Sequence, residues 1–117
     1  MTRSFKALLL VLTLIGGMTL AGGVRASSGA LTYEEARAII CFPGSEWSCP
    51  VMLGIAVRES GLDNTAVNKD SGCACLFQIH PIHGNNQGLL TSDPYACTAA
   101  AYRLFLAAGY TPWRATE

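Results

Sequence analysis

Apolar residues recur at helical spacing in two long segments of the chain. Met52, Ile55 and Ala56 fall at i, i+3 and i+4, which places their side chains on one face of a helix. A second apolar stripe lies nearer the C-terminus and consists of Cys97, Ala100, Ala101, Leu104 and Ala108. The pattern therefore predicts two helices that bury these faces against the rest of the chain.

Residues that start and stop helices bound three predicted helices. A residue that can cap the first turn precedes each helix, and glycine follows two of them. The predicted helices run from Thr32 to about Cys41, from Ser45 or Ser48 to about Ser60, and from Asp93 to about Ala108. Glu35 completes a capping box with Thr32 at the start of the first helix. Pro50 and Pro94 lie in the first turns of the second and third helices, and Gly61 and Gly109 follow the last turns of the same two helices.

Between the second and third helices the pattern changes to short extended runs. Residues 65–68 and 73–79 predict two strands, and the turn-forming residues 69–72 would join them into a β-hairpin. Residues 80–90 are rich in Pro, Gly and Asn and predict a loop. With 117 residues the chain has room for one domain, and we expect an α+β fold that is mainly helical with a small β-hairpin.

Residues 1–26 have the order of a secretory signal peptide. Arg3 and Lys6 precede an uncharged apolar run, and small residues flank the arginine in the Val-Arg-Ala tripeptide that ends at Ala26. The run is too short and too glycine-broken for a membrane span. We expect cleavage after Ala26, with Ala21 as the alternative site, which leaves a domain of residues 27–117 and no stable membrane span. An uncleaved anchor helix is the competing interpretation.

Composition excludes some classes of function. Half of the residues are apolar and only 14% are charged, so long disorder is not expected. Beyond the leader, five basic side chains stand against eight acidic ones, a formal charge of −3. The sequence has no basic stripe interleaved with aromatic residues, so we expect no nucleic-acid partner.

All five cysteines lie beyond the leader. Export brings a chain to an oxidising compartment, where disulfides form. Cys41 and Cys49 are candidates for a short-loop disulfide, and either Cys73 or Cys75 could pair with Cys97. Because the number of cysteines is odd, one thiol is left over or pairs elsewhere.

Glu59 is a carboxylate on the apolar face of the predicted second helix, seven positions after Met52. Burial disfavours the charged form of a carboxylate, and so does the negative end of the helix macrodipole. A carboxylic acid that stays neutral near neutral pH can donate a proton to a leaving group, as glycoside cleavage requires. The competing interpretation is a surface glutamate beside Arg58.

Several short strings surround Glu59 in a fixed order. They are Glu59-Ser60-Gly61, Ala66-Val67-Asn68, Leu76-Phe77-Gln78-Ile79, His83-Gly84, Asp93-Pro94 and Gly109-Tyr110-Thr111-Pro112-Trp113. This ordered set resembles the soluble lytic transglycosylase domain, which is related to goose-type lysozyme, and more closely its small secreted and phage-borne lysozyme-like version. The resemblance covers about residues 47–113 and implies a lysozyme-like fold.

The resemblance also implies roles for individual side chains. The matching positions are the catalytic acid/base Glu59, the neighbouring Ser60 that helps to orient the site, the groove-lining Gln78, the hairpin residue Asn68, and the aromatic Tyr102 and Trp113. Asn68 is either a sugar contact or only a turn residue. The two aromatic side chains either line the cleft or pack in the core.

Two positions depart from the family pattern. The glycine that the family has before the Leu-Phe-Gln string is Cys75 here, which predicts a changed backbone or a rearranged disulfide. Relatives often have a cysteine directly before Glu-Ser-Gly, where this chain has Arg58. The cysteine of the hairpin therefore lacks the partner that the family would supply.

The reaction depends on how many carboxylates take part. Asp63 and Asp70 are the candidates for a second catalytic acid, but both lie in predicted turns. The resemblance implies a lytic transglycosylase with Glu59 as its single acid/base. It would cleave the β-1,4 bond between N-acetylmuramic acid and N-acetylglucosamine in peptidoglycan glycan strands. A muramidase that hydrolyses the same bond and a non-catalytic wall-binding module are the alternatives.

We expect this enzyme to act as a monomer without a cofactor, secreted or located in the periplasm or cell wall. A metal site is the rival interpretation for one group of residues. Cys73, Cys75, His80 and His83 have the spacing Cys-x-Cys-x4-His-x2-His, which could supply a tetrahedral ligand set. Because export favours disulfides, we expect no bound metal.

Overall fold

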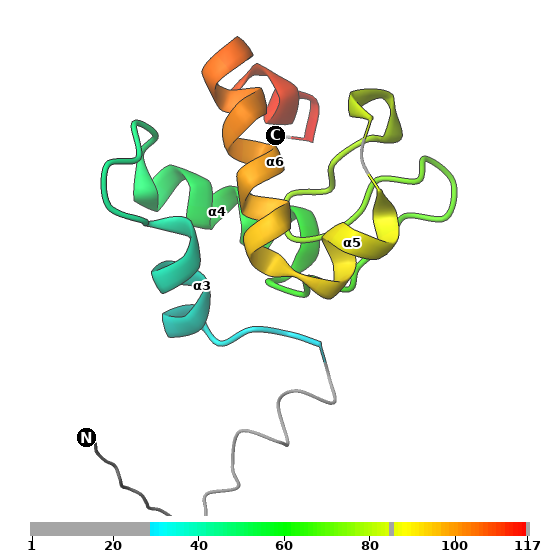
Figure 1. Ribbon diagram of the computed structural model, residues 1–117, viewed down its shortest axis with the longest axis horizontal. Helices are drawn as coiled ribbons and strands as arrows, with labels where there is room; N and C mark the ends of the chain where they lie inside the picture. The colour runs from blue at the N-terminus through cyan, green and yellow to red at the C-terminus, as the bar shows by residue number, and fades with distance from the viewer. Residues whose placement is uncertain (1–28, 85, 117) are drawn as a thin grey trace, which may run out of the picture.

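The computed structural model describes residues 29–84 and 86–116. The predicted signal peptide and its cleavage site lie outside this part of the chain. The described part is mostly helical, and its elements are α3 (Tyr33–Ile40), α4 (Cys49–Ser60), η1 (Pro81–His83), α5 (Gln87–Ser92), α6 (Pro94–Ala108) and η2 (Thr111–Thr116). Helix α6 stands at the centre and packs against α3, α5 and η2, while α4 packs against α3 (Figure 1).

The first predicted helix is confirmed as α3, and its start follows from a capping box. The Glu35 N–H donates to Thr32 Oγ1 at 3.1 Å, and the Thr32 N–H donates to Glu35 Oε1 at 2.9 Å. These two hydrogen bonds satisfy backbone donors that the first turn of a helix leaves free.

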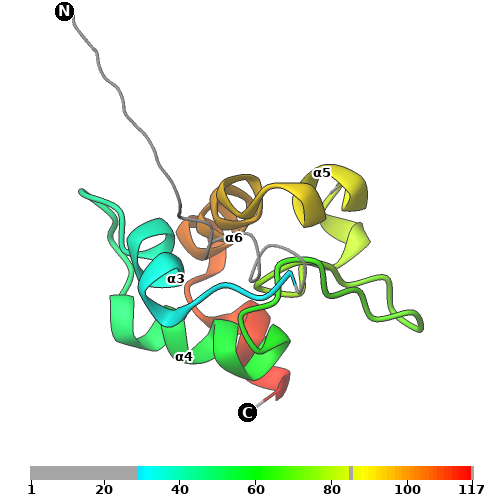
Figure 2. The ribbon, with the colours of Figure 1, turned by 90° about the horizontal axis from the view of Figure 1, so that it is seen from below.

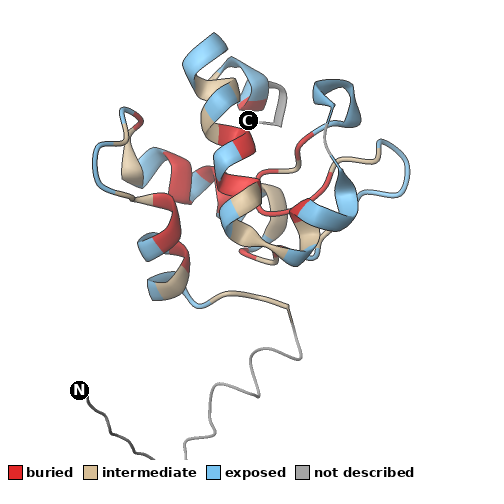
Figure 3. Cartoon of the chain, in the orientation of Figure 1, coloured by how far each residue is buried: buried red, intermediate tan, exposed pale blue. Residues whose placement is uncertain are grey.

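Helix α4 confirms the second predicted helix and decides between its two candidate caps. The Val51 N–H donates to Ser48 Oγ at 3.3 Å, so Ser48 rather than Ser45 is the cap. Gly61 ends the helix in the left-handed conformation, with a φ of 63°. The three apolar residues of the predicted face, Met52, Ile55 and Ala56, are buried, and α4 packs against α3. Figure 3 shows the buried part of the helix in red.

Helix α6 begins and ends where the sequence predicts. Asp93 caps it by accepting a hydrogen bond from the Tyr95 N–H at 2.9 Å, and Gly109 follows its last residue. The predicted stripe is buried only in the first half of the helix, where Cys97 lies in the core. Ala108 is exposed, because this end of α6 projects beyond the core (Figure 3).

The predicted second strand, residues 73–79, is wrong. Within the described residues the segment forms only isolated bridges, in which Ala74 pairs with both Val67 and Ile79. The chain reverses between these bridges, because Cys75 and Gln78 have positive φ angles of 72° and 51° that break an extended run. The predicted strand at 65–68 is likewise reduced to the single bridge at Val67.

The predicted loop over residues 80–90 contains two short helices, η1 and α5. His80 caps η1 by accepting a hydrogen bond from the Ile82 N–H at Nδ1, at 3.0 Å. Asn86 caps α5 in the same way by accepting from the Leu89 N–H at 3.1 Å. The segment is therefore more regular than its content of Pro, Gly and Asn suggests.

An aromatic cluster and two disulfides hold these elements together. The Trp47 ring lies with its centroid within 6.0 Å of the rings of Phe42, Phe77, Tyr102 and Phe105. The disulfides are Cys41–Cys49, between α3 and α4, and Cys75–Cys97, between the turn and α6. Cys73 is the cysteine left over. None of the helices in the described part is long and apolar enough to cross a membrane.

Candidate active site

A cleft of about 320 Å³ opens between the end of α4, the segment that follows it and η2. Figure 2 shows η2 beside the C-terminal end of α4. The residues that line the cleft are Glu59, Asn68, Ser71, Cys73, Gln78, Ile79, His80, His83, Leu104, Pro112 and Trp113. Four of the six predicted site residues, namely Glu59, Asn68, Gln78 and Trp113, are therefore brought together although up to 54 positions separate them in the sequence.

Glu59 reaches the cleft from the last turn of α4. Its side chain is only 9% exposed, and Arg58 Nη2 lies 3.7 Å from Glu59 Oε2. The carboxyl group is thus nearly buried and lies beside Arg58, and its role as a proton donor stays a prediction. The guanidinium supplies a positive charge to a carboxylate that has lost most of its contact with water.

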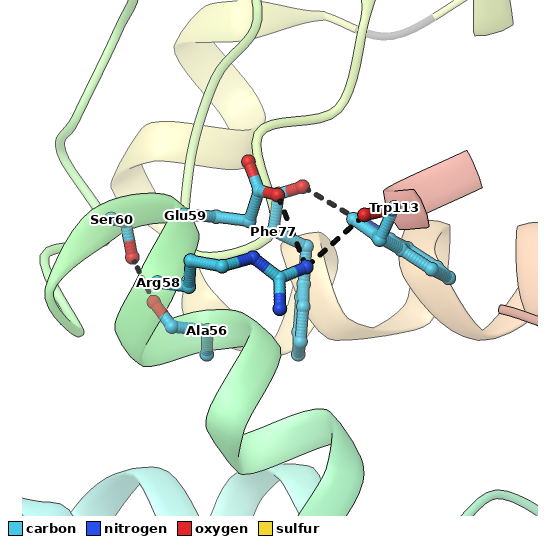
Figure 4. Close-up of polar contacts among 6 residues, drawn as sticks. All are labelled: Ala56, Arg58, Glu59, Ser60, Phe77 and Trp113. Atoms are coloured by element: carbon cyan, nitrogen blue, oxygen red, sulfur yellow. Dashed lines mark hydrogen bonds and ion pairs between the residues drawn. The ribbon is translucent and has the colours of Figure 1, made fainter. Parts of the chain in front are cut away.

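Arg58 also ties the end of α4 to the C-terminal segment. Its Nη2 donates to the Trp113 carbonyl oxygen at 3.1 Å, and Trp113 Nε1 donates to the Phe77 carbonyl oxygen at 3.0 Å (Figure 4). Trp113 is 4% exposed and its ring meets that of Phe77 edge to face at 6.2 Å. Trp113 therefore lines the cleft and packs in the core at the same time.

Gln78 is held in a strained turn by its own side chain. Its φ of 51° lies in the left-handed region, and Nε2 donates to the carbonyl oxygens of Ala66 at 3.1 Å and Cys75 at 3.0 Å. These bonds use both hydrogens of the amide group. Gln78 can therefore offer a ligand only its acceptor Oε1.

Asn68 shapes the wall of the cleft as a turn residue. Its Oδ1 accepts hydrogen bonds from the Asp70 N–H at 2.9 Å and the Ser71 N–H at 3.2 Å. The side chain also lines the cleft. Asn68 is therefore a turn residue that also lies at the cleft, and a contact with a sugar stays a prediction.

Cys75 matches a glycine of the family that the sequence resembles, and its backbone has a conformation that glycine favours. Its φ of 72° is left-handed, and its side chain is buried in the disulfide with Cys97. The structure therefore has Cys75 both in a disulfide and in a left-handed backbone conformation. A non-glycine residue in this conformation costs about 1 kcal/mol.

Ser60 and Tyr102 are not part of the cleft. The Ser60 hydroxyl turns back along α4 and donates to the Ala56 carbonyl oxygen at 3.0 Å (Figure 4). The Tyr102 hydroxyl accepts from the Glu46 N–H at 3.0 Å, and its ring packs against Phe42. Tyr102 therefore follows the core-packing interpretation rather than the cleft-lining one.

Neither candidate for a second carboxylate reaches the cleft. Asp63 accepts hydrogen bonds from the Thr65 N–H at 2.9 Å and the Thr65 hydroxyl at 2.6 Å, and Asp70 lies exposed in its turn. Among the described residues that line the cleft, Glu59 is the single carboxylate.

His80 and His83, two of the four residues with metal-ligand spacing in the sequence, line the cleft. In the part of the chain that the structure describes, no three His, Cys, Asp or Glu side chains are grouped closely enough to hold a metal ion. Cys75, one of the four proposed ligands, is in a disulfide. The signal that could have placed His83 in the cleft is the His83-Gly84 string of the resemblance.

Comparisons with known proteins add no relative. No family model, no characterised protein and no solved structure is significantly similar to this chain. The function must therefore be inferred from the cleft and from the sequence strings that surround it.

Proposed function

We propose that the protein is a lytic transglycosylase with a lysozyme-like fold. Its substrate would be the β-1,4 bond between N-acetylmuramic acid and N-acetylglucosamine in peptidoglycan. One observation carries the proposal: Glu59, with a side chain only 9% exposed, is the single carboxylate among the described residues of a cleft that also holds Gln78 and Trp113.

In the first step, the protonated Glu59 donates its proton to the glycosidic oxygen as the bond to C1 of muramic acid breaks. Arg58, 3.7 Å from Glu59 Oε2, then stabilises the carboxylate that remains. In the second step, this carboxylate takes the proton of the C6 hydroxyl of the same muramic acid, and O6 attacks C1. The product is a 1,6-anhydro ring, Glu59 is protonated again, and no water is consumed.

The surroundings of Glu59 support this single-acid mechanism. A glycosidase that uses two carboxylates needs the second on the other side of the scissile bond. Asp63 and Asp70 do not line the cleft. Gln78, whose Oε1 remains as an acceptor, can position a sugar hydroxyl or amide without taking part in proton transfer.

The place of action that we propose is the cell wall or the periplasm. The two disulfides fit an oxidising compartment. Peptidoglycan strands would be the partner, and the reaction uses a monomer without a cofactor.

Replacing Glu59 by Gln tests whether the protein is an enzyme. We expect Glu59→Gln to lower the rate of lysis of purified peptidoglycan by a factor of about 10² to 10⁴, because the amide cannot donate or accept the required proton. Binding of the protein to the same peptidoglycan, measured by sedimentation, should persist. Glu34→Gln, an exposed glutamate of α3, is the matched control and should keep full activity. Unchanged lysis by Glu59→Gln would contradict the proposal.

The reaction products test the type of cleavage. We expect mass spectrometry of the soluble muropeptides to find 1,6-anhydromuramic ends, because O6 rather than water attacks C1. Reducing muramic ends would mean that the cleft holds a water molecule, and the protein would then be a muramidase.

A further inference from the structure

A second hollow, of about 440 Å³, adjoins the cleft and shares Trp113 with it. One face of α4 and the segment around η2 form its walls. The residues that give it its chemistry are Val51, Ile55, Arg58, Tyr110, Trp113 and Arg114, and we call this hollow the arginine pocket. Its Arg58 lies 3.7 Å from Glu59 of the cleft, and Trp113 lines both hollows, so the two are neighbours on the surface.

The two charged side chains of the arginine pocket are both positive. The Arg58 side chain is 36% exposed, Arg114 is exposed, and none of the described residues along the wall is acidic. This is a local exception in a chain whose acidic residues outnumber its basic ones beyond the leader. Arg58 is engaged with Glu59 and with the Trp113 carbonyl, so the exposed guanidinium of Arg114 is the group that a ligand in the pocket would meet. The pocket therefore favours an anion that arginine can bind, such as a carboxylate or a phosphate.

The floor of the arginine pocket is apolar, and part of it is fixed. Val51 is 44% exposed there and lies beside the buried Ile55. The Tyr110 hydroxyl accepts a hydrogen bond from the Ser48 N–H at 2.8 Å, which holds the tyrosine ring in place. Small apolar groups gain from burial on such a floor. A ligand that combines a carboxylate with methyl groups matches the pocket better than a phosphate polymer does.

We infer that the arginine pocket binds a carboxylate of the peptide that muramic acid carries in peptidoglycan. This peptide contains alanine methyl groups and free carboxylates, and it is attached to the same muramic acid whose bond at C1 Glu59 would cleave. The inference rests on the proposed function, because a glycan strand in the cleft is what brings the peptide to the pocket. Arg114 then selects glycan that still carries its peptide.

Binding of three small ligands tests this site. They are the disaccharide of N-acetylglucosamine and N-acetylmuramic acid with its peptide, the same molecule with its carboxylates converted to amides, and the peptide-free disaccharide with its lactyl carboxylate converted to an amide. Calorimetric titration uses the full-length Glu59→Gln protein, which should not consume them. We expect the carboxylate form to bind about fivefold more tightly than the amide form, the range of an exposed ion pair. The peptide-free disaccharide should bind no more tightly than the amide form.

Arg114→Gln, added to the Glu59→Gln protein, should abolish the preference for the carboxylate form. Arg37→Gln, which changes an exposed arginine on α3, is the matched control and should preserve it. Equal binding of the carboxylate and amide forms, or a preference that survives Arg114→Gln, would overturn the inference and leave the role of Glu59 standing. Undiminished lysis by Glu59→Gln would instead overturn the proposed function and the inference with it.

Discussion

Two non-glycine residues with left-handed backbones shape the cleft. Cys75 and Gln78 begin and end the turn between Ala74 and Ile79, and each holds a conformation that costs about 1 kcal/mol for an ordinary residue. The disulfide to Cys97 holds the first position, and the two hydrogen bonds from Nε2 hold the second. The turn that brings Gln78 to the same cleft as Glu59 therefore includes two residues with unfavourable backbone conformations.

Glycine at residue 75 should relieve part of this strain. In a Cys97→Ala background, which removes the disulfide, we expect Cys75→Gly to be more stable than Cys75→Ala by about 1 kcal/mol, because alanine keeps the left-handed penalty. Urea unfolding of the two double variants measures the difference. Equal free energies of unfolding would show that the turn relaxes to another backbone once the disulfide is gone.

Elements with local signals were predictable from the sequence, and elements that depend on distant contacts were not. Helices α3, α4 and α6 begin at side chains that cap their own first turns, so a short window of sequence contains the signal. The strand expected at 73–79 fails because positive φ at Cys75 and Gln78 leaves no trace in the pattern of apolar residues. Their conformations follow from a disulfide and from hydrogen bonds to Ala66, which lie outside that window.

The residues of the candidate site were likewise predictable only in part from the sequence. The sequence strings that resemble the transglycosylase domain contain Glu59, Gln78 and Trp113, and all three residues line the cleft. Ser60 follows Glu59 in the sequence, but a helix turns consecutive side chains by about 100°, so its hydroxyl meets the Ala56 carbonyl instead. Tyr102 shares α6 with the cleft-lining Leu104, yet it faces the aromatic cluster. Which side of a helix meets a cleft depends on packing that the strings do not encode.

The short helix η2 serves as a wall of the cleft because Trp113 anchors it. We expect Trp113→Phe to lower the free energy of unfolding by about 1–2 kcal/mol, because the buried Phe77 carbonyl would lose the indole N–H that it accepts from. Thermal and urea unfolding measure this loss, and lysis should fall with it as η2 loosens. Tyr95→Phe, which changes a side chain 67% exposed on α6, is the control and should alter stability by no more than a few tenths of a kcal/mol. A loss as small as that for Trp113→Phe would contradict the anchoring role.

At the scale of the whole molecule, two covalent links supplement a small core. A domain of this size buries too little apolar surface for a large margin of stability. Cys41–Cys49 joins α3 to the start of α4, and Cys75–Cys97 joins the cleft segment to the central helix α6. The second link closes a loop with a sequence separation of 22 residues and is expected to stabilise the fold by about 3 kcal/mol.

The left-handed backbone at Cys75 also affects where such a domain can be produced. In a reducing cytosol the bond to Cys97 would open, and the side chain at residue 75 would keep its unfavourable geometry without the link that offsets it. Cys75→Gly suits that backbone without any crosslink, and an apolar residue such as alanine or valine at residue 97 would keep the buried site on α6 filled. Intracellular production therefore calls for changing both members of this pair together.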